Sequence, residues 1–270
     1  MKKNKIILII FWVLYLLFLT DLEDMVRERS QTSVLKEHTI ESEKFREQRL
    51  DQKVYQMLQQ KAGKDGDWIE LLTSSMLDSD FHPEKISDSG KMYRKYKKKE
   101  YETLKKAYGA VWEDVRYFPV ASREIFFENS WMAKRSYGGS RFHEGCDLFG
   151  KITESGYYPI ISMTDGVVEK TGWLPLGGYR IGIRTDTGGY FYYAHLASYE
   201  KNFYPGEIVK AGDILGYMGN TGYGPAGTKG KFPVHLHLGI YIPLANKKEV
   251  SVNPYWLLKI FTKKTTNYTY

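Results

Sequence analysis

The chain has 270 residues, enough for one folded domain of enzyme size with an additional segment, and 42% of them are hydrophobic, which is compatible with a buried core. Its formal charge of +7 favours an anionic environment such as nucleic acid, an acidic membrane surface or a polyanionic cell envelope, but no nucleic-acid motif accompanies the charge, so we predict no nucleic-acid partner. The single cysteine, Cys146, excludes an intrachain disulfide.

The N-terminus predicts a membrane-associated segment. The sequence MKKNK precedes an uninterrupted apolar run at residues 6–19, and the acidic stretch TDLED follows it. This charge order predicts a cytoplasmic N-terminus with the rest of the chain on the outer side. The run is long for a signal-peptide core and short for a span of about 20 residues, so both readings stay open. Because no small-residue cleavage site follows, we favour an uncleaved signal anchor in residues 1–20 that contacts the membrane through residues 6–20.

Residues 21–120 are charged, poor in glycine and helix-like. The segment EKFREQRLDQKVYQMLQQ (43–60) predicts one helix, which the breaker GKDGD (63–67) ends, and DWIELLTSSML (67–77) predicts a second. The stretch HPEKISDSG (82–90) predicts a loop. We therefore predict a helical stalk or linker over these hundred residues.

A third helix is predicted after this loop. Its apolar positions follow at three- and four-residue steps, the spacing of one helical face: Tyr101, Leu104, Tyr108, Val111 and Val115. The Lys-rich run RKYKKKE (94–100) predicts a solvated face of the same helix.

Residues 121–262 predict an all-β domain, an antiparallel sandwich or barrel-like structure, with residues 263–270 as a tail. Glycines cluster there, and short apolar runs lie between turn signals: YYPIIS, DGVVEKTG, YRIGIRTDTGGYFYYAHL, AGDILGYMGNTG and VHLHLGIYI. The stretch RTDTGGY predicts a hairpin turn. The faint similarity of DGVVEKTG to AGDILGYMG indicates an internal duplication.

The strand VHLHLG (234–239) carries two histidines at alternate positions. Successive strand side chains point to opposite faces, so His235 and His237 share one face, about 6 to 7 Å apart. Histidines in strands are commonly surface or core residues, and this alternative has to be weighed. Two further histidines, His143 and His195, lie upstream in motifs of their own.

The motif HEGCD places His143 and Asp147 four residues apart, with Gly145 between them. Imidazole and carboxylate are both good zinc ligands, and a glycine allows the backbone to turn so that both side chains face one point. Together with a histidine of the H-x-H strand they would make a three-ligand site with a fourth position open to water, which is typical of catalytic zinc.

Four motifs in this order resemble the lysostaphin- and LytM-type zinc metallopeptidases, which cut peptidoglycan cross-links: HEGCD, YAHL (193–196), GDILGYMGNTG (212–222) and HLHLG (235–239). The resemblance covers about residues 138–245 and implies a fold of the duplicated-hybrid-motif type. It implies zinc as cofactor, with the ligands His143, Asp147 and His237. It also implies that His195 and His235 form the catalytic pair beside the hydrolytic water and the scissile carbonyl.

Three features lie outside the shared motifs. No H-E-x-x-H glutamate base is present, and Glu144 is predicted to face solvent. Cys146 stands where the family has a small apolar residue, so we expect a structural side chain that points away from the metal, with a fifth ligand or a redox switch as alternatives. The link at residues 148–162 is longer and more aromatic than the family's usual one.

The sequence thus predicts a zinc endopeptidase of the cell membrane, with its catalytic domain extracellular or periplasmic, that hydrolyses peptide stems or cross-bridges of peptidoglycan. The alternative is a non-catalytic wall-binding or scaffold protein on the same fold, which would predict an incomplete ligand set, whereas all five motif residues are present here. An activator whose helical stalk recruits another hydrolase also stays open, as do divisome or sporulation partners.

Overall fold

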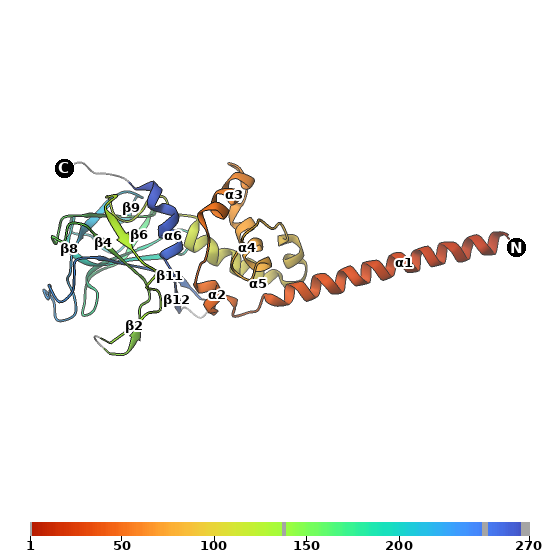
Figure 1. Ribbon diagram of the computed structural model, residues 1–270, viewed down its shortest axis with the longest axis horizontal. Coiled ribbons are helices and arrows are strands. Elements are labelled where there is room, and N and C mark those ends of the chain that lie inside the picture. Colours follow the sequence, from red (N-terminus) through yellow and green to blue (C-terminus); the bar gives the residue numbers. More distant parts are fainter. Residues whose placement is uncertain (1, 137–138, 245–247, 266–270) are drawn as a thin grey trace.

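The described chain runs from a long N-terminal helix through a helical segment to a sheet (Figure 1). The structure is a computed structural model and describes residues 2–136, 139–244 and 248–265; residues 266–270 of the predicted tail lie outside them. The α-helices are α1 (Lys2–Gln31), α2 (Glu43–Arg46), α3 (Gln52–Ala62), α4 (Trp68–Asp78), α5 (Gly90–Trp112) and α6 (Tyr255–Phe261), with short 3-10 turns at Thr32–Val34, Thr39–Glu41 and Thr262–Lys264.

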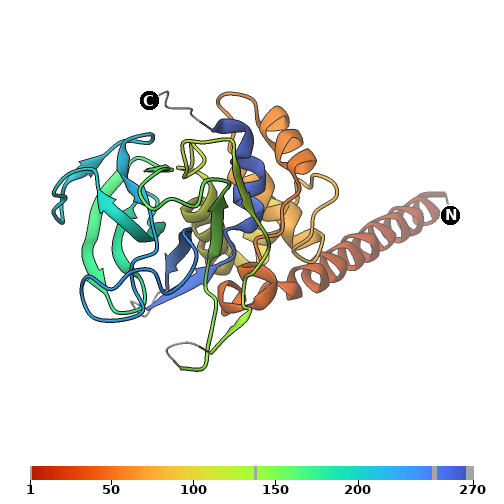
Figure 2. The ribbon, with the colours of Figure 1, turned by 60° about the vertical axis from the view of Figure 1, so that its left-hand side comes forward.

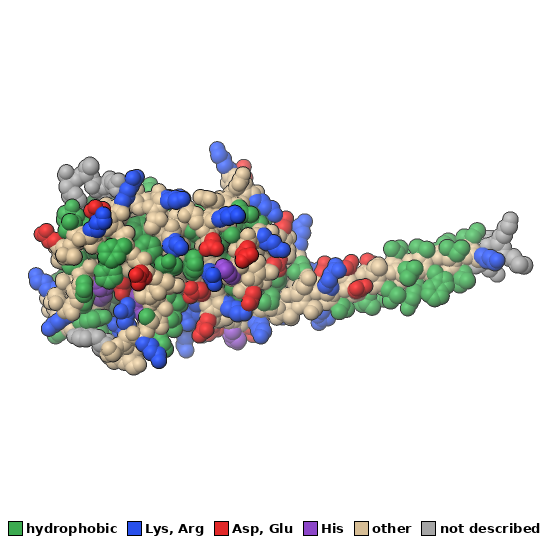
Figure 3. Space-filling view, in the orientation of Figure 1, with side chains coloured by type: hydrophobic (Ala, Val, Ile, Leu, Met, Phe, Trp, Pro, Cys, Tyr) green, Lys and Arg blue, Asp and Glu red, His purple; other side chains and the backbone are tan. Residues whose placement is uncertain are grey.

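Helix α1 projects away from the rest of the molecule (Figures 1 and 3). Apolar side chains cover most of its length, and charged ones follow nearer the body. Among the described helices it alone is long and apolar enough to span a membrane, and its apolar part is exposed. A membrane anchor and a signal sequence both have these properties.

The prediction of one continuous helix over residues 43–60 is wrong, because the structure contains two helices there, α2 and α3. The break lies at Gln48, whose φ of +50° leaves the helical region. Its buried side chain donates a hydrogen bond to the Phe45 carbonyl and accepts one from Trp112 Nε1, both at 2.7 Å. Two buried partners therefore hold a backbone conformation that the helix pattern does not contain. The second predicted helix corresponds to α4 and the third to α5, and the loop before α5 is also confirmed.

The helical segment packs directly on the sheet (Figure 2). Arg46 in α2 donates from Nε to the carbonyl of Ser251 and from Nη2 to its hydroxyl, both at 2.9 Å. The backbone N–H of Asn253 donates to the Arg46 carbonyl at 2.8 Å. In the same interface the ring of Tyr55 lies 6.1 Å from that of Phe261. One hydrophobic core thus extends from the helical segment into the sheet.

The sheet has ten strands and is antiparallel in every described pairing, in the order β1-β4-β11-β8-β7-β6-β9, with β10 joining β5 to β8 and β12 pairing with β11. A separate two-stranded sheet pairs β2 with β3. The strands are β1 (Ile125–Phe127), β2 (Lys134–Arg135), β3 (Arg141–Phe142), β4 (Cys146–Gly150), β5 (Pro159–Ile161), β6 (Gly166–Leu174), β7 (Gly178–Arg184), β8 (Tyr190–Tyr199), β9 (Ile208–Val209), β10 (Ile214–Met218), β11 (Leu236–Pro243) and β12 (Glu249–Val252). The predicted hairpin is confirmed as β7–β8.

Strands β4 and β11 show why one face of the sheet is available for chemistry. In β4, Cys146 and Leu148 are buried, whereas Asp147 between them is only partly so. In β11, Leu236 and Leu238 are buried on either side of His237. Alternation therefore directs the apolar side chains into the core and the polar ones towards the opposite face.

Candidate active site

A groove of about 910 Å³ lies over the exposed face of β4, β11, β8 and β7. All five histidine and aspartate residues predicted for the site line it, together with aromatic and cationic side chains. The aromatic and cationic side chains of the lining include those of Arg135, Arg141, Phe149, Lys170, Arg180 and Phe232, and the small Ala194 lies among them.

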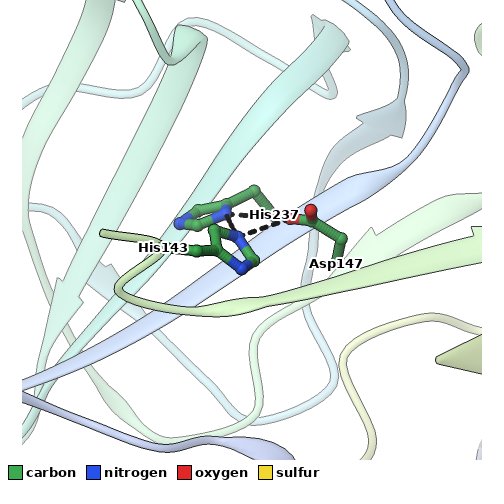
Figure 4. A group of neighbouring side chains, drawn as sticks. All are labelled: His143, Asp147 and His237. Atoms are coloured by element: carbon green, nitrogen blue, oxygen red, sulfur yellow. Dashed lines mark hydrogen bonds and ion pairs between the residues drawn. The ribbon is translucent and has the colours of Figure 1, made fainter. Parts of the chain in front are cut away.

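His143, Asp147 and His237 meet at one point of this groove (Figure 4). Asp147 lies opposite His237 in the register of β4 with β11, so the two side chains leave the same face of neighbouring strands. Three atoms form a triangle with 3.0 Å sides: His143 Nε2, Asp147 Oδ1 and His237 Nδ1. The fold thus brings together two imidazole nitrogens and one carboxylate oxygen, although His143 and His237 are 94 positions apart in the sequence.

This donor set is suitable for zinc. Zinc in proteins takes histidine nitrogens at about 2.0 to 2.1 Å and carboxylate oxygens at about 2.0 to 2.2 Å, and tetrahedral ligands at such distances lie roughly 3.3 Å apart. The observed separations of 3.0 Å are close to that value. Two nitrogens and one oxygen also correspond to the three-ligand sets of catalytic zinc, which leave a fourth position for water or substrate.

Residues outside the three ligands orient them. The ring of His143 is held through Nδ1 by the hydroxyl and the carbonyl of Ser130, each at 3.1 Å, which leaves Nε2 directed at the cluster. Arg135 Nη2 donates to Asp147 Oδ2 at 2.8 Å, so only Oδ1 faces the histidines. Burial acts to raise the pKa of Asp147, but the hydrogen bonds with His143 and His237 outweigh it and hold that pKa far below its usual range. Asp147 is therefore ionised.

Gly145 creates the space in which the His237 ring lies. A Cβ at this position would be 2.5 Å from His237 Cε1 and 2.6 Å from the Leu238 carbonyl oxygen. Both distances are shorter than real contacts allow, and the second involves backbone that cannot rotate away. The glycine of HEGCD is thus required for the close approach of β4 and β11.

We expect Gly145→Ala to lower zinc affinity about 10- to 100-fold, the range found when groups that orient metal ligands are lost. Competition with a chromogenic chelator measures this affinity. Gly109→Ala in α5 is the matched control, because its Cβ would meet only the mobile end of Glu113, at 3.1 Å. Equal zinc affinity in both variants would contradict the role given to Gly145.

A bulge in β8 turns His195 into the groove. In the register of β7 with β8, Ile181 pairs with Tyr193 and Tyr179 with Leu196, so the strand carries one extra residue at this point. His195 has a φ of +64°, which is uncommon for a residue other than glycine. Simple alternation from Ala194 would place the His195 side chain on the core face, and the bulge redirects it beside the metal-ligand cluster.

His195 and His235 are held in the same tautomer. Each donates from Nδ1 to a backbone carbonyl at 2.8 Å, His195 to Thr221 and His235 to Pro233. A carbonyl oxygen only accepts, so in each neutral ring Nε2 keeps a lone pair. The Nε2 of His235 lies 3.6 Å from Asp147 Oδ1, and the rings of His195 and His235 are 4.8 Å apart. Both rings thus present a proton acceptor next to the cluster.

Burial keeps both of these rings neutral at neutral pH. It is the main cause that lowers the pKa of His195 to about 3, and it also lowers the pKa of His235. Phe232 lies 4.5 Å from the His195 ring, and Phe149 stacks on His235 at 5.1 Å. These aromatic walls exclude water from one side of each imidazole.

Two neighbouring residues lie as predicted. The Glu144 side chain is half exposed and lies 3.8 Å from Arg46, outside the metal-ligand cluster. Cys146 is buried on the opposite face of β4, where its Sγ contacts the Glu128 carbonyl at 3.5 Å. Burial raises the pKa of this thiol well above its usual range, so it stays protonated.

Sequence reasoning did not identify Ser130, Arg135, Phe149 or Phe232. None belongs to a motif with a fixed spacing from the ligands, and the contacts form only when the sheet assembles. Phe149 is the one with a usable signal, because it stands two positions after Asp147 in β4 and therefore shares its face.

The fold and this groove define an antiparallel β protein with a two-histidine, one-aspartate metal-ligand set. Residues 141–254 match the family described as Peptidase family M23. A crystal structure from Ruminococcus gnavus, described as a candidate glycyl-glycine endopeptidase LytM, is 41% identical with a TM-score of 0.74, over 89% of this chain and 98% of that chain. The chain belongs to peptidase family M23, whose metallopeptidases typically depend on zinc.

Two curated relatives match shorter parts. The L-Ala–D-Glu endopeptidase of Bacillus subtilis is 41% identical over 157 residues, which is 58% of this chain and 47% of that protein. Lysostaphin of Staphylococcus staphylolyticus is 36% identical over 97 residues, 35% of this chain and 18% of that protein. The chain thus spans less than half of the length of these relatives.

Proposed function

We propose that the protein is a zinc-dependent endopeptidase that hydrolyses the peptide part of bacterial peptidoglycan. The observation that supports it most is the convergence of His143, Asp147 and His237 in one groove, with the Nε2 of His235 3.6 Å from the aspartate oxygen. A scaffold protein on this fold would have no need of a complete ligand set or of two further neutral histidines. Family membership and the names of the relatives support the choice of reaction.

The proposed mechanism gives each group a separate task. His143 Nε2, Asp147 Oδ1 and His237 Nδ1 hold the zinc ion. Zinc, when bound, supplies a Lewis acid that polarises the scissile carbonyl and activates water. The neutral imidazoles of His195 and His235 accept a proton at Nε2 and return it to the leaving amine. Their Nδ1–H groups stay bonded to the Thr221 and Pro233 carbonyls, so the rings keep their orientation while the proton moves.

Purified full-length protein in detergent should release peptide fragments from wall sacculi, and a chelator should abolish the release. Added zinc should restore it. Mass spectrometry of the soluble products identifies the bond that is cut. Sacculi that bind the protein but release nothing in the presence of zinc would instead support the wall-binding alternative.

We also propose that residues 1–20 anchor the protein in the cell membrane, that residues 21–120 connect them to the peptidase domain at residues 121–262, and that this domain lies outside the cytoplasm. The exposed apolar length of α1 supports the anchor. We further propose that the sheet is barrel-like and of the duplicated-hybrid-motif type.

Protease added to intact protoplasts should therefore digest the C-terminal region while the protein sediments with membranes, because the apolar helix stays in the bilayer. Immunoblots with antibodies against each end measure this. A C-terminal region protected in intact cells would refute the topology, and its release into the medium without protease would indicate cleavage after the apolar helix.

A further inference from the structure

The floor of the groove carries an arginine without an assigned task. Arg180 on β7 lines the groove, and its Nη1 is buried without a hydrogen-bond partner in the part of the chain that the structure describes. A buried donor that lacks a partner destabilises the protein by about 1 to 3 kcal/mol, and more when the group is charged. One explanation for such a group is a bound ligand that accepts the hydrogen bond of Arg180 Nη1.

Apart from Arg180 and Arg141, the charged groups of the groove that the structure describes lie next to an opposite charge. Asp147 bonds Arg135, Glu249 lies 2.5 Å from Arg184, and Glu144 lies 3.8 Å from Arg46. Lys170 is 3.8 Å from Glu169. Arg141 donates from Nη2 to the hydroxyl of Tyr223, but its Nε is also buried without a partner among the described residues, so it is a second cation of the groove without an opposite charge. Across residues 2–136, 139–244 and 248–265, Arg180 makes no ion pair. The groove therefore presents an uncompensated positive charge at this point.

The register places this charge close to the proposed chemistry. Arg180 lies opposite the bulged pair Ala194–His195, because its neighbours Tyr179 and Ile181 pair with Leu196 and Tyr193. Ala194 in turn pairs with His237. Neighbouring strands lie about 4.8 Å apart, so the backbones of Arg180 and His237 are separated by about 10 Å. The small Ala194 side chain between them leaves the floor open.

This spacing determines which part of a substrate meets Arg180. An extended peptide advances about 3.3 Å per residue, and the arginine side chain covers several ångströms of the 10 Å. A group held by Arg180 therefore belongs to a residue at the scissile bond or next to it. The planar guanidinium pairs best with a carboxylate, which it binds through two parallel hydrogen bonds.

We propose that Arg180 is a specificity residue that binds a substrate carboxylate beside the scissile bond, and that the substrate is an acidic stem peptide of the L-Ala–D-Glu type. This inference rests on the proposed function. A glutamate joined to alanine through its amino group and to the next residue through one carboxyl keeps its second carboxyl free, on the residue that supplies the scissile amide nitrogen. A glycyl-glycine bridge has no free carboxylate beside the scissile bond, so it leaves the charge of Arg180 unpaired.

Two synthetic peptides test the proposal on the full-length protein in detergent. Both are acetyl-L-Ala–D-Glu–L-Lys joined through the glutamate side-chain carboxyl, one with the second carboxyl free and the other with it converted to a carboxamide. The wild type should favour the acid over the amide about 10- to 100-fold in kcat/KM, as expected for a hydrogen-bonded charge pair, with the difference in KM. Arg180→Gln should reduce this ratio towards one by a selective loss on the acid peptide, and Arg180→Lys should keep part of it.

Lys170→Gln is the matched control, because it removes one positive charge from the neighbouring strand of the same groove and should keep the ratio within about threefold of wild type. An Arg180→Gln protein that keeps the wild-type ratio, or that loses activity equally on both peptides, would overturn the proposal. Calorimetric binding of both peptides to His195→Ala protein, with and without Arg180→Gln, gives a readout that needs no turnover. If neither peptide is hydrolysed while sacculi still release peptide fragments, the acidic-stem substrate is overturned and the proposed function stands. If sacculi release nothing either, the proposed function fails, while an acid preference in binding that disappears with Arg180 would still support the carboxylate site.

Discussion

His237→Ala should lose zinc and wall hydrolysis together. The imidazole supplies one of three protein ligands, and its Nδ1 lies 3.0 Å from both of the other donor atoms. With only His143 and Asp147 left, the site has too few ligands to hold zinc at a catalytic geometry. Elemental analysis of the purified chain should show about one zinc ion per wild-type molecule and far less in the variant, with hydrolysis of sacculi reduced to background. Asp147→Ala should behave in the same way.

His38→Ala is the control for this variant, because His38 is exposed and bonds only Glu41 among the described side chains. Its zinc content and activity should equal those of the wild type. A His237→Ala protein that is folded by circular dichroism and still carries one zinc ion would remove His237 from the ligand set.

His195→Ala and His235→Ala should fail differently from His237→Ala. Each leaves all three ligands in place, so zinc should stay bound. Turnover should fall about 100- to 10,000-fold, the range for a lost general acid or base. Because both rings act on the same proton, the double variant should lose much less than the product of the single losses. Zinc content, circular dichroism and hydrolysis measured on the same preparations separate these effects.

His195 needs a second substitution because its φ of +64° strains alanine. Asparagine tolerates this conformation better, so His195→Asn tests the loss of the imidazole with less disturbance of the bulge. Full activity of His195→Asn or His235→Ala would show that these rings do not transfer the proton. A zinc-free but folded His235→Ala protein would mean that His235 is a ligand.

The site was partly predictable because two of its elements obey simple periodicity. Alternation predicts one shared face for His237 in β11 and His235 directly before it, and it places Asp147 away from the core in β4. The contact between Asp147 and His237 depends on the register of β4 with β11, which alternation in either strand leaves undetermined. In the sequence it was the shared motifs, and not periodicity, that linked the two segments.

The remaining parts depend on irregular backbone or on distant contacts. The bulge that redirects His195 breaks the two-residue period at the residue that matters, so alternation alone predicts the wrong face. The helix break at Gln48 arises from hydrogen bonds to Phe45 and to Trp112, the second lying 64 positions away. Phe45 is a local partner, but Trp112 is not, so helix propensity around Gln48 does not predict the break that this tertiary contact stabilises.

The bonds between Arg46 and Ser251 limit how this protein can be divided by genetic engineering. A fragment restricted to residues 141–254, which carry the family signature, would lack Arg46 in α2 and both rings of the contact between Tyr55 and Phe261. Strand β12 would keep its pairing with β11 but lose the Arg46 bonds to Ser251, and apolar side chains now covered by the helical segment would meet water. The portion that can be transplanted into another enzyme is therefore larger than the portion that carries the chemistry, and its N-terminal limit lies before residue 35, where the shared core begins.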